Sequence, residues 1–119
     1  MESTYEAQAR VFKAFCDEKR LRILELLRDG EKCACVLIAQ LDMPQSSLSY
    51  HMKILCESGV VDGRQEGKWT HYQISEQGSR IALALLEAIT TTNAGAQESL
   101  CCRYPVAKSE ALVTCKLSD

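Results

Sequence analysis

The sequence is poor in several features that mark special classes of protein. Only 2 of its 119 residues are proline and 2 are histidine, and aromatic residues make up 6%. No apolar run is long enough to cross a bilayer, and the stretch MESTYEAQAR shows no basic segment followed by an apolar one, as a secretory signal would. The net charge of -2 is unlike the strongly basic balance of many nucleic-acid-binding proteins. We therefore expect a cytoplasmic protein without a membrane partner.

Cysteine, in contrast, is abundant. Persistent disulfides are not expected in a reducing compartment, so clustered thiols indicate metal binding or redox chemistry. Cys16 and Cys56 stand alone in the sequence, and we predict that both pack in the core. The seven cysteines are Cys16, Cys33, Cys35, Cys56, Cys101, Cys102 and Cys115.

Hydrophobic periodicity predicts four helices, a hairpin and a last helix. The helices are expected over 4–16, 18–30, from 32 or 33 to 42, and over 45–58. Residues 60–74 have the β-prone pattern of a hairpin with a polar tip, and Ser75 is placed to cap a helix over 76–92. Two short helices joined by a tight turn and followed by a hairpin form a winged helix-turn-helix. We predict a mainly α fold with a β-hairpin wing over residues 1–92, and a cysteine-containing tail over 93–119.

The helix predicted over 45–58 has one apolar and one polar side. Leu48, Met52 and Leu55 define the buried stripe, while Ile54 falls on the outward half. The polar side carries short hydroxyls that allow close approach to a DNA groove, although an ordinary solvated face fits the same pattern. His51 lies between the two sides, where it either contacts a phosphate or packs. The candidate DNA-contacting residues are Gln45, Ser46, Ser47, Ser49, Tyr50, His51 and Lys53, with Arg64 and Lys68 on the hairpin.

Four segments, in this order and spacing, resemble one known family: FCDEKRLRILELL, CAC, LSYHMKIL and SGVVDGRQEGKWTHYQI. Over roughly residues 8–90 the chain is similar to the ArsR/SmtB family of metal-sensing transcriptional repressors. The resemblance implies a homodimer that binds double-stranded operator DNA when metal-free and is released by its effector. It also implies pairing through the first and last helices, which carry Val11, Phe12, Phe15, Leu83, Leu86 and Ile89.

The resemblance leaves the effector site open among several arrangements. Zinc sensors use the last helix, but neither His51 nor His71 lies there, and no cysteine precedes Cys16 as in cadmium and lead sensors. The segment EKCAC resembles the corresponding segment of arsenic sensors, but this chain has Ile38 where those sensors carry a further cysteine. Thiolates prefer soft ions, so we predict trivalent arsenic or antimony, inorganic or organic, as the effector. The candidate ligands are Cys33, Cys35, Cys101, Cys102 and Cys115.

Residues two apart on an α-helix point to nearly opposite sides. One small ion is therefore expected to bind both Cys33 and Cys35 only if the helix starts late or unwinds, and such a distortion would move the helix that reads DNA. The alternatives are a cadmium- or lead-type repressor and a thiol-redox-sensing repressor of the same fold. A thiol enzyme is disfavoured, because the sequence has no Cys-x-x-Cys before a helix and no glycine-rich cofactor loop.

Overall fold

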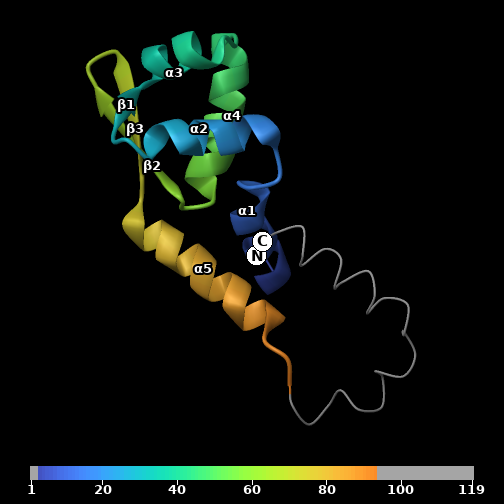
Figure 1. Cartoon of the computed structure of the whole chain (residues 1–119). Helices are drawn as coiled ribbons and strands as arrows, with labels where there is room; N and C mark the ends of the chain where they lie inside the picture. Colours follow the sequence, from blue (N-terminus) through green and yellow to red (C-terminus); the bar gives the residue numbers. More distant parts are fainter. Residues whose placement is uncertain (1–2, 94–119) are drawn as a thin grey trace. The chain divides into compact units, whose positions relative to one another are not determined.

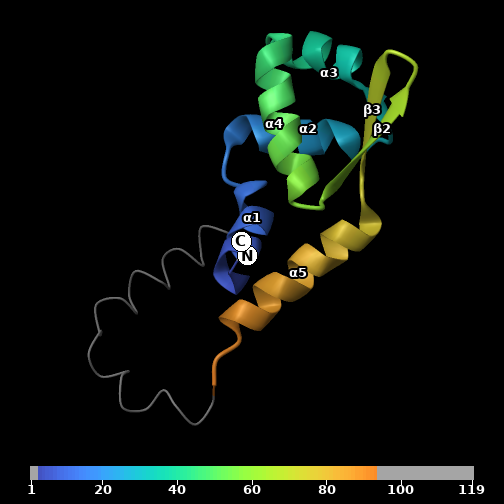
Figure 2. The same cartoon turned by 180° about the vertical axis from the view of Figure 1, so that it is seen from behind.

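A computed structural model describes residues 3–93 of the chain, and the residues up to Ala88 form one compact unit (Figures 1 and 2). The described helices are α1 (Thr4–Lys13), α2 (Glu18–Leu27), α3 (Ala34–Leu41), α4 (Gln45–Glu57) and α5 (Glu76–Thr90). Strands β1 (Lys32–Cys33), β2 (Val61–Glu66) and β3 (Trp69–Ile74) form an antiparallel sheet in the order β1-β3-β2. The predicted order of helices and hairpin is confirmed. None of these helices is both long and apolar enough to span a bilayer.

The helix ends follow local capping chemistry. Asp17 is the N-cap of α2. Because its acidic side chain is short, it can accept hydrogen bonds from the backbone N–H groups of Lys19 and Arg20 in the first turn. Ser75 does the same for α5, accepting from the N–H of Gly78 at 3.0 Å. α4 ends just before Gly59, whose φ of +85° lies in the left-handed region that glycine tolerates best. These boundaries were predictable from the sequence.

The predicted start of the third helix was wrong by one or two residues. Lys32 and Cys33 form β1, which pairs with Tyr72 and His71 of β3, and the helix begins only at Ala34. β1 covers part of an edge of β3 that would otherwise leave backbone groups unpaired. A strand of two residues has no periodicity of its own, so sequence patterning did not find it.

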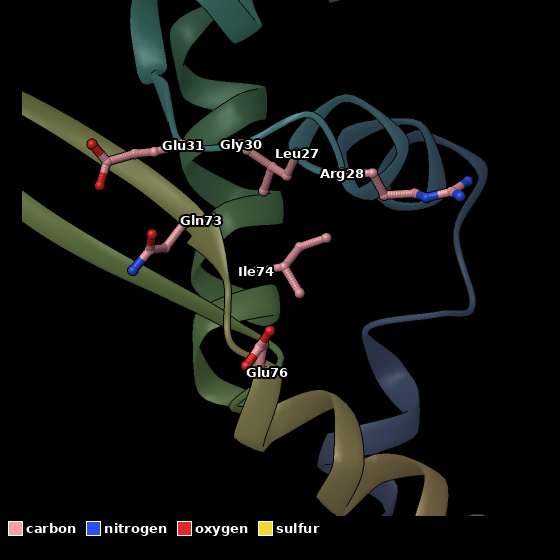
Figure 3. A pocket seen from close by; sticks show the side chains of 7 residues that line it. All are labelled: Leu27, Arg28, Gly30, Glu31, Gln73, Ile74 and Glu76. Carbon is pink, nitrogen blue, oxygen red and sulfur yellow. The ribbon is translucent and has the colours of Figure 1, made fainter.

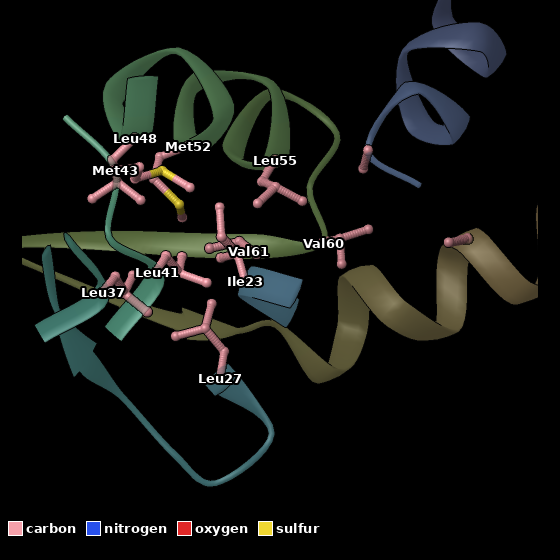
Figure 4. Packing of buried hydrophobic residues seen from close by; sticks show 12 residues of the cluster. Ile23, Leu27, Leu37, Leu41, Met43, Leu48, Met52, Leu55, Val60 and Val61 are labelled. Carbon is pink, nitrogen blue, oxygen red and sulfur yellow. The ribbon is translucent and has the colours of Figure 1, made fainter. Parts of the chain in front are cut away.

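The core lies where α2, α3, α4 and β2 meet (Figure 4). Leu48, Met52 and Leu55 are buried as predicted, but Ile54 is also buried, at 6% exposure. α4 contacts α1 as well as α2, α3 and β2, so its buried surface is wider than the predicted stripe. Periodicity within one helix does not show how many neighbours surround it.

The two isolated cysteines differ from each other. Cys56 is half-buried against the core, as predicted. Cys16 is exposed, which corrects the prediction that it packs in the core. The reason is the early end of α1 at Lys13, which leaves Cys16 in the connection to α2 instead of on a helical face.

Gly78 in the first turn of α5 is expected to be the position least tolerant of a side chain. A Cβ there would collide with the backbone carbonyl of Gly59, which cannot rotate away as a side chain can. We expect Gly78→Ala to lower the free energy of unfolding by about 1–3 kcal/mol, the usual cost of overpacking. Urea denaturation measures it, with Gln77→Ala on the exposed side of the same turn as control. Equal midpoints for the two variants would contradict this packing.

Candidate nucleic-acid interface and thiol site

One side of α4 presents polar side chains to solvent. Tyr50 is 58% exposed, and the other exposed side chains on this side belong to Gln45, Ser46, Ser49 and Lys53, with Ser47 half-buried. The N-cap is Pro44, which supplies no side-chain hydrogen bond to the first turn. The first backbone N–H groups of α4 are therefore not capped by the N-cap side chain, and such groups suit a phosphate. Five of the seven α4 residues predicted to contact DNA are thus exposed, and their contact with DNA stays a prediction.

His51 is the exception among the candidate DNA contacts, because it is buried at 6% exposure. Its Nδ1 atom lies 3.0 Å from Nη1 of Arg20, which is itself 4% exposed and donates from Nε to the Lys13 carbonyl. A guanidinium only donates hydrogen bonds, so Nδ1 accepts and the ring is neutral. The structure places His51 as a packing residue between α2 and α4, and does not support its predicted contact with DNA.

Burial lowers the pKa of His51, and the charge of Arg20 acts in the same direction while Asp17 opposes it. Since the unfolded chain titrates near the ordinary histidine pKa of about 6.5, it binds more protons than the folded protein below that pH. The contribution of His51 to stability is therefore expected to be constant above about pH 6.5 and to fall on acidification, by at most about 1.4 kcal/mol per pH unit. His51→Gln keeps an acceptor for Arg20 but cannot titrate, so its urea midpoint should fall less between pH 7.5 and 5. Parallel curves for the two proteins would rule out this role.

The hairpin β2–β3 forms the wing, and its tip lies at the same end of the unit as the first turn of α4 (Figures 1 and 2). Arg64 on β2 forms ion pairs with Glu31, at 2.7 Å, and with Glu66, at 3.2 Å. Lys68 lies over the ring of Trp69, 5.5 Å from its centroid, and Trp69 is 50% exposed. Both predicted wing residues thus lie at the surface, but Arg64 is neutralised by carboxylates. Sequence reasoning selected neither Glu31 nor Trp69, although Trp69 stands out as the only tryptophan in the chain.

The thiols of Cys33 and Cys35 lie together, with their Sγ atoms 3.0 Å apart. Cys33 is the N-cap of α3 with extended backbone, and Cys35 is in the first turn, so the two side chains are not opposed as they would be within a helix. The late helix start was one of the two possibilities that the sequence left open. Unwinding is not needed to bring the sulfurs together.

A hydrogen bond joins the two thiols. Cys35 donates to Cys33, and this hydrogen bond, with backbone N–H groups at the start of α3, lowers the pKa of Cys33. The same interaction raises the pKa of Cys35. The pair therefore loses its first proton more readily than an isolated cysteine, and the resulting thiolate is the nucleophile and the soft ligand.

Within residues 3–93, no three His, Cys, Asp or Glu side chains are grouped so that they could hold a metal ion. Ile38, where the arsenic sensors carry a further cysteine, is half-buried against the core. Cys33 and Cys35 bring two sulfur atoms together, and sulfur donors suit a soft, thiophilic ion. The other candidate ligands, Cys101, Cys102 and Cys115, lie outside the described residues.

An apolar hollow of about 400 Å³ lies between α1 and α5. Leu83 on its wall is 69% exposed, more than any other large apolar side chain of α5. Contiguous exposed apolar surface of this kind marks a protein–protein interface more often than a monomer surface. The lining residues are Phe12, Phe15, Ser79, Ala82, Leu83 and Leu86.

The helix pair α3–α4, with its exposed polar second helix and the wing that follows, defines a winged helix-turn-helix DNA-binding regulator. A family model described as "Bacterial regulatory protein, arsR family" matches residues 17–62. The chain belongs to this ArsR family of transcriptional regulators, as its relatives also show.

Two curated relatives align with this chain over most of their own length. An uncharacterized HTH-type transcriptional regulator of Methanocaldococcus jannaschii is 40% identical over 71% of this chain and 97% of its own. The arsenical resistance operon repressor of Staphylococcus aureus is 34% identical over 76% of this chain and 86% of its own.

Solved structures agree with the fold. The homodimeric winged helix-turn-helix domain of a possible ArsR-family regulator from Mycobacterium bovis has a TM-score of 0.59 and 29% identity, covering 79% of this chain and 94% of that one. A possible transcriptional regulator for arsenical resistance has a TM-score of 0.58 and 29% identity, covering 70% of this chain and 83% of that one.

Proposed function

We propose that the protein is a homodimeric repressor of an arsenic-resistance operon, released from its operator when trivalent arsenic or antimony binds cysteine thiolates. The observation that carries the proposal is the pair of sulfur atoms 3.0 Å apart at the start of α3, the first helix of the helix-turn-helix. Relatives named as arsenical resistance operon repressors, such as that of Staphylococcus aureus, support the choice of effector.

DNA recognition in this proposal uses α4 and the wing. The exposed side chains of Ser46, Ser49, Tyr50 and Lys53 read the major groove and its phosphates, and Lys68 at the wing tip contacts the flanking backbone. A single copy with a net charge of -2 is a weak binder. Two copies joined through the α1–α5 hollow place two α4 helices on two half-sites, which is why the operator is expected to be near-palindromic.

Metalloid capture at Cys33 and Cys35 needs no oxidant or reductant. When neutral arsenious acid reacts with a thiol, an As–S bond replaces an As–O bond and one water leaves, so two thiols release two waters. The third position on arsenic keeps its hydroxyl, or carries an organic group, or accepts a thiolate from Cys101, Cys102 or Cys115. Because the pKa of Cys33 is lowered by its hydrogen bond from Cys35, Cys33 attacks first.

The elements that carry Cys33 and Cys35 contact the elements that would bind DNA. α3 contacts α4 directly, and β1 contacts β3 of the wing. A movement at the start of α3 therefore reaches both parts that bind DNA. A change in operator occupancy from nearly full to nearly empty needs about 3–5 kcal/mol of differential binding, which metal–thiolate bonds can supply.

Fluorescence anisotropy of a labelled duplex from the region upstream of the gene tests the proposal. The reduced, metal-free protein should raise the anisotropy, and arsenite or antimonite should return it to the free-duplex value, whereas zinc should not. If cadmium or lead releases the duplex and arsenite does not, the effector assignment is wrong. If the reduced protein does not bind the duplex, the repressor assignment fails as well.

A thiol-redox repressor is the second candidate, since sulfurs already in contact are well placed to form a disulfide. A thiol oxidant such as diamide, added without metalloid, distinguishes the two. Release by diamide in stoichiometric amounts, one oxidant consumed for each disulfide formed, with no response to arsenite would favour redox sensing.

A further inference from the structure

We propose that Glu31 is a positioning residue. Its ion pair with Arg64 joins the strand that carries Cys33 to the wing, so that binding of an ion to the thiols changes the position of the wing. The inference rests on the proposed function and adds the route by which the signal leaves the thiol site.

The strand register brings the thiol site and the wing into one row. Cys33 on β1 and Arg64 on β2 are both directly opposite His71 of the central strand β3. Directly opposite residues of antiparallel strands have side chains on the same face of a sheet. The two outer strands do not pair with each other, so any direct link between them must come from side chains that reach across β3.

Glu31 and Arg64 make that link. Nη2 of Arg64 donates to Oε1 of Glu31 at 2.7 Å, and its Nε donates to Oε2 at 3.3 Å, which makes the pair bidentate. A bidentate guanidinium–carboxylate pair fixes orientation as well as distance. With residues 31–33 held at one end and β2 at the other, the pair sets the position of the wing relative to the thiols.

The segment before Cys33 has room to move. Glu31 lines an open hollow of about 340 Å³ between the end of α2 and β3, and Figure 3 shows Glu31 and Gln73 at one side of it and Arg28 at the other. Gly30, with φ of +125°, joins this segment to the turn after α2. An ion bridging Cys33 and Cys35 must replace their 3.0 Å contact by bonds to a common atom, which displaces Cys33. Since β1 is only two residues long, the displacement carries Glu31 away from Arg64.

The chain offers a matched control for this ion pair. Arg64 also pairs with Glu66, at 3.2 Å. Glu66 is on β2 and its other contact, at 3.5 Å from Nε2 of His71, is with β3, so it makes no link to β1. Glu31→Gln and Glu66→Gln each remove one negative charge beside Arg64 and each keep an acceptor oxygen. Any general gain in affinity for DNA from the lost charge is therefore common to both variants.

The experiment measures operator affinity for wild type, Glu31→Gln and Glu66→Gln, without and with saturating arsenite. The response is the ratio of the dissociation constant with arsenite to the dissociation constant without it. We expect Glu31→Gln to weaken operator binding in the absence of arsenite and to reduce the ratio about two- to five-fold relative to Glu66→Gln, the range for a partly exposed ion pair. Arsenite binding to the DNA-free variant, followed by thiolate absorbance, should be retained. Combining Glu31→Gln with Arg64→Gln should reduce the ratio no further than Arg64→Gln alone.

Two results would overturn the inference while leaving the proposed function intact. One is an equal ratio for Glu31→Gln and Glu66→Gln when wild type is released normally. The other is tighter operator binding, without arsenite, by Glu31→Gln than by Glu66→Gln, which would mean that Glu31 competes with phosphate for Arg64. If arsenite does not release wild type, the proposed function itself fails and the inference fails with it.

Discussion

Replacing Cys33 and Cys35 together by serine is expected to leave operator binding intact and to abolish release by arsenite. Cys35 is exposed and Cys33 half-buried, and neither belongs to the core, so the fold should tolerate both changes. A serine hydroxyl is neither soft nor ionised at neutral pH, and the site loses both of its sulfur donors. We expect the arsenite concentration for half-release to rise about 100-fold or more, as when metal–thiolate bonds are lost from a site. Anisotropy titrations of the labelled duplex measure it.

Cys16→Ser is the matched control for this pair, since Cys16 is an exposed thiol outside the site, and it should respond to arsenite as wild type does. Cys101→Ser/Cys102→Ser tests whether the tail supplies a further ligand. A weakened response in that variant would add a tail thiolate to the site. A wild-type response in Cys33→Ser/Cys35→Ser would show that the sensing thiols are elsewhere.

Leu83→Asp is expected to convert the proposed dimer into a monomer and to lower operator affinity about 100-fold or more, because a monomer reads one half-site only. Leu83 is 69% exposed on the wall of the α1–α5 hollow, so the aspartate costs the single subunit little. In the dimer the same carboxylate would be buried against apolar side chains without a partner, at a cost of several kcal/mol. Sedimentation velocity gives the oligomeric state and anisotropy gives the affinity.

Leu21→Asp makes the same chemical change at a 48% exposed leucine of α2 that does not line the hollow, and should remain dimeric. A Leu83→Asp protein that sediments as a dimer and binds DNA normally would place the interface on another surface.

The order of the elements was predictable because it depends on short-range signals. Asp17 and Ser75 cap helices from their own sequence neighbourhood, and Gly59 ends α4 in the same way. The burial of Ile54 and His51 was not predictable, because it depends on which elements surround α4. An arginine 31 residues away satisfies the His51 ring, and no local pattern indicates such a partner.

The thiol site was only half predictable. The motif Cys33-Ala34-Cys35 predicted a site for a soft ion, which stays a prediction, and the separation of its two sulfurs depended on where α3 begins. That start is set by pairing of Cys33 with His71, a contact between residues far apart in the sequence. The link from Glu31 to Arg64 spans 33 residues and was not predictable for the same reason.

We expect that the protein cannot bind a soft ion at Cys33 and Cys35 and bind its operator tightly at the same time. The most direct test titrates arsenite into the preformed protein–duplex complex while recording thiolate–arsenic absorbance and duplex anisotropy in the same cuvette. Both signals are expected to change together, with the duplex set free as the thiols fill. Absorbance that saturates while the anisotropy stays at its bound value would contradict the proposed mechanism.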